Sequence, residues 1–121
     1  MDKGKKILIV EDEVLIALAL KKELNAEGYE NCRFVTSGEK AIADVKNGPP
    51  DLLLMDINLG GKLNGFDTAL RIREFADIPL VFMSGYEDAQ IRQDIREFSR
   101  AYYLEKPVRL NDIMRIISKK L

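Results

Sequence analysis

Four polar fragments of this chain could together carry phosphoryl chemistry. They are Glu11-Asp12-Glu13, Asp56, Ser84-Gly85 and Lys106-Pro107. Each fragment comes at the carboxyl end of an apolar run of the kind that forms a buried strand. Carboxylate oxygens suit Mg²⁺, a hard ion that takes six oxygen ligands, and a carboxylate can attack phosphorus as a nucleophile. The fragments therefore predict a divalent-cation site in which Asp56 is the nucleophile.

The charges of these side chains are consistent with such a site. Glu11, Asp12 and Asp56 bring three negative charges, and Lys106 together with a divalent cation brings three positive ones. Without the cations, crowded carboxylates repel one another and one of them tends to take up a proton.

Each fragment also has an ordinary structural explanation when it is taken alone. The acidic run at 11–13 could open a helix, Asp56 could form a turn, Ser84 could cap a helix, and Pro107 could begin one. These explanations give no reason why all the fragments should follow apolar runs. Their joint occurrence favours a shared site.

Composition narrows the class of protein. The chain has 121 residues, a formal net charge of −1 and a single cysteine, Cys32, which we interpret as a small apolar strand residue. A chain without a basic excess is not expected to bind nucleic acid directly. The apolar run at 7–10 is too short for a signal peptide or a membrane span, so we expect a cytoplasmic protein with no membrane contact. With no histidine, the chain cannot carry a phosphoryl group on an imidazole, so the group must come from elsewhere.

Strand and helix patterns alternate along the whole chain. The predicted strands cover residues 7–10, 30–35, 52–55, 80–83 and 101–104. The predicted helices cover 13–27, the segment from the Ser37 cap to 46, 66–75, 88–98 and 110–120, and residues 58–65 form a loop. This alternation predicts one α/β domain over 1–121, a doubly wound parallel sheet with right-handed crossovers. Alternation alone does not set the strand order, but the order 2-1-3-4-5 would bring Glu11, Asp12 and Asp56 into one crevice.

These motifs resemble those of a response-regulator receiver domain of two-component signalling, and the resemblance covers essentially the whole chain. Its motif positions match the acidic pair Glu11-Asp12, the phosphoacceptor Asp56, the hydroxyl residue Ser84, the aromatic switch residue Tyr103 and Lys106-Pro107. No motif position is missing, which argues against a degenerate relative that is not phosphorylated.

The resemblance implies a phosphorelay function. Asp56 would take a phosphoryl group from a phosphohistidine of a histidine kinase or phosphotransfer protein. Mg²⁺, or another divalent cation such as Mn²⁺, would be held by Asp12, Asp56 and the backbone carbonyl of Asn58, with Glu11 acting through a water. Lys106 would pair with Asp56 and then with a phosphoryl oxygen. The chain would be no enzyme beyond its own phosphorylation and dephosphorylation.

The resemblance also implies a conformational switch. On phosphorylation Ser84 would move inward and the ring of Tyr103 would turn from exposed to buried. The changed surface would control a downstream effector protein or an output domain, and a phosphorylation-dependent homodimer is a further expectation.

Two features depart from or exceed the family pattern. Gly60 stands where proline is common, and one residue is added before Gly65, so we expect a more flexible loop and an altered metal affinity. The first helix has more apolar residues than one buried face needs. We expect Ile16, Ala17, Leu20 and Leu24 to face the core, and Leu15, Leu18 and Val14 to be left for a partner.

Three other functions remain to be weighed. A flavodoxin would need a hydroxyl- and glycine-rich phosphate loop where this chain has Glu11-Asp12-Glu13, and a metal-dependent phosphatase would want an acid where Asn58 stands. A receiver-fold interaction module without phosphorylation would explain the fold but leave the polar set unused. Formation of an acid-stable, hydroxylamine-labile phosphoryl adduct would separate these readings.

Overall fold

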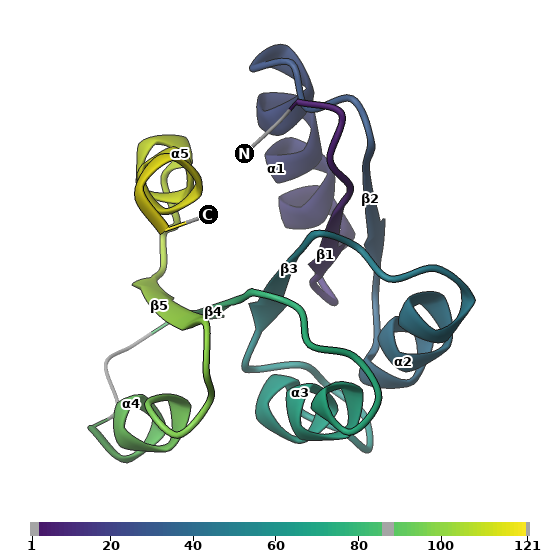
Figure 1. The fold of residues 1–121 in the computed structure, drawn as a ribbon, viewed down its shortest axis with the longest axis vertical. Coiled ribbons are helices and arrows are strands. Elements are labelled where there is room, and N and C mark those ends of the chain that lie inside the picture. Colours follow the sequence, from purple (N-terminus) through teal and green to yellow (C-terminus); the bar gives the residue numbers. More distant parts are fainter. Residues whose placement is uncertain (1–2, 86–88, 121) are drawn as a thin grey trace.

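Five parallel strands form a sheet in the order β2-β1-β3-β4-β5 in the computed structural model, which describes residues 3–85 and 89–120 (Figure 1). The strands are β1 (Ile7–Val10), β2 (Cys32–Val35), β3 (Leu52–Asp56), β4 (Leu80–Ser84) and β5 (Ala101–Glu105). The helices are α1 (Val14–Ala26), α2 (Gly38–Asn47), α3 (Gly65–Arg73), α4 (Ala89–Ile95) and α5 (Leu110–Lys120). The predicted doubly wound fold and its strand order are thus confirmed.

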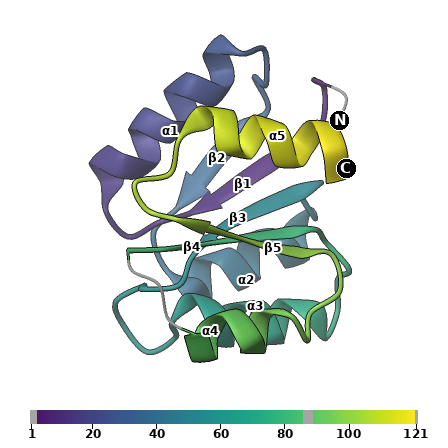
Figure 2. The ribbon, with the colours of Figure 1, turned by 90° about the vertical axis from the view of Figure 1, so that its left-hand side faces the viewer.

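Helices cover both faces of the sheet. Figure 2 shows α1 and α5 on one face and α2, α3 and α4 on the other. The three central strands, β1, β3 and β4, are buried along their whole length. Because a parallel strand buried on both faces has no polar side, these segments read as continuous apolar runs.

Two apolar cores lie on the two sides of the sheet. Ala17, Leu20 and Leu24 of α1 and Ile113 and Ile117 of α5 pack on one face. The other face carries a group of three aromatic rings. Phe82 and Phe98 lie 5.6 Å apart between ring centroids, and Phe66 lies 5.4 Å from Phe98.

The first helix differs in one respect from the expected pattern. Ile16 was expected in the core but is 44% exposed, whereas Leu18, expected at the surface, is half-buried. Leu15 is 82% exposed and Val14 50% exposed, as expected. The buried stripe is therefore narrower than predicted, because Ala17, Leu20 and Leu24 suffice to fill the face toward the sheet.

Some strands and helices are shorter than predicted. The second strand begins at Cys32 rather than at 30, and α4 ends at Ile95 rather than at 98, while the predicted start of α4 at 88 lies outside the described residues. Cys32 is buried, and burial raises the pKa of its thiol to about 11, so it is a neutral strand residue at pH 7. Among the described residues, no helix is both long and apolar enough to span a bilayer.

Candidate phosphoacceptor and metal site

Strand register brings the polar fragments to one edge of the sheet. Val10 pairs with Met55, so Glu11 follows β1 at the level at which Asp56 ends β3. Asp56 pairs with Met83, and Ser84 pairs with Glu105, so Lys106 lies directly beyond the end of β5. Since all five strands are parallel, their carboxyl ends share this edge.

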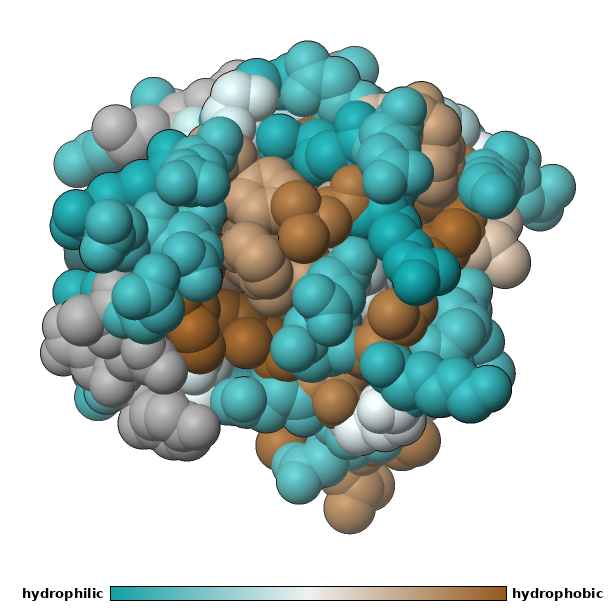
Figure 3. All heavy atoms as spheres, turned by 90° about the horizontal axis from the view of Figure 1, so that it is seen from below, coloured by the Kyte–Doolittle hydropathy of each residue, from teal (hydrophilic) through white to brown (hydrophobic). Residues whose placement is uncertain are grey.

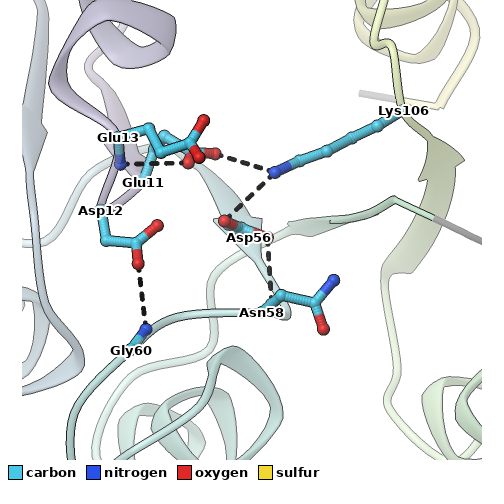
Figure 4. A network of polar contacts seen from close by, with 7 residues as sticks. All are labelled: Glu11, Asp12, Glu13, Asp56, Asn58, Gly60 and Lys106. Atoms are coloured by element: carbon cyan, nitrogen blue, oxygen red, sulfur yellow. Dashed lines mark hydrogen bonds and ion pairs between the residues drawn. The ribbon is translucent and has the colours of Figure 1, made fainter.

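Lys106 connects the two buried carboxylates of the site. Its Nζ lies 3.2 Å from Glu11 Oε2 and 3.2 Å from Asp56 Oδ2 (Figure 4). Glu11 and Asp56 are each 1% exposed, whereas the Lys106 side chain is 25% exposed. The ammonium group therefore reaches from the surface to a pair of carboxylates that water scarcely touches.

Backbone amides fix the orientation of both carboxylates. The N–H of Asn58 donates to Asp56 Oδ1 at 3.0 Å, so each Asp56 oxygen has a partner. The N–H of Glu13 donates to Glu11 Oε1 at 3.2 Å. In both cases the amide lies two residues after the carboxylate that it binds. The chain therefore turns back on itself just beyond the end of each strand.

Burial and repulsion perturb the titration of this group. Burial, and then the charge of Asp56, raise the pKa of Glu11 to about 7, although Lys106 acts in the opposite direction. Burial lowers the pKa of Lys106, but Asp56 and Glu11 outweigh it, so the pKa is raised and the ammonium stays charged. One ammonium thus does not neutralise the acidic residues around it.

The acidic residues fit a divalent cation. Glu11, Asp12 and Asp56 can each offer one carboxylate oxygen such that these oxygens lie within 4.8 Å of one another. An all-oxygen donor set suits Mg²⁺, whose octahedral shell is completed by waters and backbone carbonyls. Three carboxylates and one ammonium leave two negative charges, which a divalent cation balances.

Of the remaining predicted residues, Ser84 and Asn58 lie beside this centre and Tyr103 lies on the edge strand. Ser84 is the last residue of β4 and is buried, and its carbonyl accepts the N–H of Lys106 at 2.6 Å. Asn58 is exposed and lies two residues after Asp56. Tyr103 lies on the edge strand β5, opposite Phe82, and is half-buried with the Arg92 guanidinium 4.8 Å from its ring centroid. Its ring is thus neither fully exposed nor fully buried in this state.

Two glycines near the site matter through their backbone, Gly60 in the β3–α3 connection and Gly65, which was predicted to end that loop but is the first residue of α3. Gly60 donates its N–H to Asp12 Oδ2 at 3.1 Å. A Cβ on Gly65 would lie 2.1 Å from the carbonyl oxygen of Asp56, so α3 can start against β3 only with glycine there. The sequence marks Gly60 as a departure from the family pattern but does not predict its contact with Asp12.

Comparison with known proteins agrees with this geometry. Residues 7–118 match the model of the response regulator receiver domain. The chain is 41% identical over 78 residues to the transcriptional regulatory protein YvrH of Bacillus subtilis, covering 64% of this chain and 32% of YvrH. It is 28% identical over 119 residues to the sporulation initiation phosphotransferase F of the same organism, covering 98% of this chain and 94% of that protein.

Solved structures show the same fold. The N-terminal domain of a response regulator/sensory box/GGDEF three-domain protein from Carboxydothermus hydrogenoformans has a TM-score of 0.83 at 36% identity, covering 94% of this chain and 91% of that one. A CheY-like receiver domain protein from Methanospirillum hungatei has a TM-score of 0.86 at 26% identity, covering 96% and 92%. The chain spans about a third of YvrH and 55% of PdtaR of Mycobacterium tuberculosis, to which it is 29% identical over 113 residues. With its fold, the edge of its sheet and its sequence all in agreement, the chain belongs to the response regulator receiver domain family.

Proposed function

We propose that this chain accepts a phosphoryl group on Asp56 from the phosphohistidine of a histidine kinase or phosphotransfer protein. Receiver domains serve phosphorelay signalling and are generally signalling modules, not enzymes with a separate substrate. The observation that carries the proposal is the contact of Lys106 Nζ with both buried carboxylates, 3.2 Å from each. The ammonium stands where it can pass from the carboxylate of Asp56 to an incoming phosphoryl oxygen.

In the proposed reaction an Asp56 carboxylate oxygen attacks phosphorus in line. An O–P bond forms while the N–P bond of the donor breaks, and the electron pair of that bond stays on the imidazole nitrogen. Asp12, Asp56 and the backbone carbonyl of Asn58 would hold Mg²⁺, or Mn²⁺ in its place, which when bound neutralises charge on the transferring group. Lys106 supplies a compact positive charge beside Asp56, and Glu11 would support a bound cation through a water.

The donor protein is proposed to dock beside α1. A groove runs between α1 and the chain that follows β5; Leu15, Ile16 and Ala19 line one side, and Pro107 and Val108 the other. Glu11 and Lys106 line the same groove, so a partner seated there would present its phosphohistidine close to Asp56. The exposed apolar side chains of α1 would supply the contact area.

Phosphorylation is proposed to switch the β4–β5 edge of the sheet. It replaces one negative charge by nearly two and adds three acceptor oxygens. An extra unit charge at about 4 Å is worth roughly 4 kcal/mol at an effective dielectric of 20, and reversing a two-state equilibrium from 1:99 to 99:1 takes about 5.5 kcal/mol. The Ser84 hydroxyl would move to a phosphoryl oxygen, and the Tyr103 ring would follow into the core. A downstream effector or output domain would read the changed surface.

The decisive experiment is mass spectrometry after incubation with a small-molecule phosphodonor and Mg²⁺. We expect a hydroxylamine-labile adduct of about 80 Da, one phosphoryl group on a carboxylate nucleophile, that is absent without the divalent cation. Asp56→Asn should abolish the adduct and leave the fold intact, as judged by circular dichroism. Absence of the adduct from the wild-type chain would overturn the proposal and favour an interaction module that works without phosphorylation.

A further inference from the structure

The connection between β3 and α3 reaches across the sheet edge to Asp12. The Gly60 N–H donates to Asp12 Oδ2 at 3.1 Å, although the two residues are 48 positions apart. Asp12 is exposed, unlike Glu11 and Asp56, so packing does not hold its side chain. Figure 4 shows one Asp12 oxygen directed at Gly60 and the other on the side of Asp56.

The connection itself is anchored on both sides of Gly60. The Asn58 N–H is bonded to Asp56, and Leu59 is 7% exposed. At the far end Asn64 caps α3, its side chain accepting the N–H of Asp67 at 2.8 Å. Because the backbone around Gly60 is anchored, its amide can fix the orientation of the Asp12 carboxylate.

We propose that Gly60 is a positioning residue of the cation site, and that it acts through its backbone N–H. The hydrogen bond engages Oδ2 of Asp12 and would leave Oδ1 available to a cation held by the carboxylates of Glu11, Asp12 and Asp56. This inference rests on the proposed function, because it presupposes that these three carboxylates bind a divalent cation. Groups that orient a metal ligand typically change metal affinity by 10- to 100-fold when they are removed.

In this chain, whose connection has one residue more than the common family pattern and a glycine where proline is common, position 60 contributes its N–H. A Cβ there would meet only Asp12 Oδ2, at 3.4 Å, an ordinary contact distance. The left-handed backbone of this connection lies at the next residue, Gly61, with φ at +92°. We therefore expect position 60 to tolerate alanine, whereas proline, which has no N–H, removes the donor.

The test compares Gly60→Pro with the conservative variant Gly60→Ala by titrating each with Mg²⁺ in calorimetry. We expect Gly60→Pro to weaken Mg²⁺ binding about tenfold or more, and Gly60→Ala to retain the wild-type affinity to within about twofold because it keeps the N–H. Equal affinities of the two variants would overturn the inference alone, and no Mg²⁺ binding by the wild-type chain would overturn the proposed function as well.

Two further measurements cover the case in which proline distorts the loop. Replacing Gly60 by glycolic acid through semisynthesis exchanges the N–H for an ester oxygen without adding a proline ring, and we expect the same tenfold loss. In the metal-free wild-type chain, the Gly60 amide should be protected from hydrogen exchange, and Asp12→Ala should remove that protection. An ester form that binds Mg²⁺ like the wild type, or an unprotected Gly60 amide, would contradict the proposal.

Discussion

Glu11 is a buried carboxyl group whose titration is perturbed by its surroundings. Its carboxyl group is buried beside Asp56, and Lys106 compensates only in part, so its pKa rises to about 7. A carboxyl group whose pKa is higher in the folded than in the unfolded chain stabilises the fold at low pH. That stabilisation is lost as pH rises from the ordinary value of 4.5 through about 7.

Removing this carboxyl group should flatten the pH dependence of stability. We expect Glu11→Gln to gain about 2 to 3 kcal/mol in unfolding free energy relative to wild type between pH 4.5 and pH 8, since each pKa unit corresponds to about 1.4 kcal/mol. Urea denaturation of both proteins in the presence of a chelator measures the unfolding free energy at each pH. If the free energies of variant and wild type differ by the same amount at pH 4.5 and pH 8, the prediction is contradicted. Added Mg²⁺ should restore much of the wild-type stability at pH 8.

At the scale of the element, α1 has to satisfy two requirements. Ala17, Leu20 and Leu24 bury one stripe against the sheet. Val14, Leu15 and Ile16 are exposed at the end of the helix nearest Glu11. These apolar side chains contribute little to the core, and their position beside the site agrees with docking of a phosphoryl donor.

Leu15 is therefore the residue that best separates docking from folding. Because it is 82% exposed, Leu15→Asp should change the unfolding free energy by no more than about 0.5 kcal/mol. It should slow phosphotransfer from a phosphohistidine protein at least several-fold and leave uptake from a small phosphodonor unchanged. Leu18 is less suitable, because it is half-buried and its substitution would also disturb packing.

A matched control is available on the opposite side of the sheet. Figure 3 views the molecule from the side of α2, α3 and α4, where apolar side chains also reach the surface between hydrophilic ones. Leu70 of α3 is 47% exposed, and Leu70→Asp should leave both phosphotransfer reactions unaffected. If Leu70→Asp and Leu15→Asp slow transfer equally, then α1 is not the docking element.

At the scale of the whole molecule, the sheet connects the site to a distant surface. Ser84 ends β4 beside Asp56, and β4 pairs along its length with β5, which carries Tyr103. Tyr103 packs in turn against α4 through Arg92. Tyr29, by contrast, lies beyond α1 in the core on the other face of the sheet.

Nuclear magnetic resonance of labelled tyrosine rings can therefore test the proposed switch. We expect phosphorylation of Asp56 to shift the ring resonances of Tyr103 and to leave those of Tyr29, 3% exposed, nearly unchanged. Asp56→Asn treated in the same way should show neither change. Identical Tyr103 spectra before and after phosphorylation would rule out the aromatic part of the switch, and size-exclusion chromatography of the same samples would detect a phosphorylation-dependent homodimer.

The sequence alone determined the fold class and predicted which residues gather at one edge of the sheet. Apolar runs such as Leu52–Met55 are continuous because both faces of a central parallel strand are covered, so their positions could be read directly. Parallel strands end at a common edge, and this rule alone predicts that Glu11, Asp56, Ser84 and Lys106 lie together. The predicted ends of helices such as α4 were less accurate. Fraying and packing determine where a helix ends, more than local sequence preference does.

Only the tertiary structure decided how the site is held. The bond from Gly60 to Asp12 joins residues 48 positions apart, and no periodicity or motif encodes the angle at which a loop returns to a carboxylate. The exposure of Ile16 likewise depends on how α1 is rotated against the sheet, which packing of the whole core determines. Local patterns specify which face of an element is buried on average, but distances of about 3 Å between remote groups follow from the packing of all the elements together.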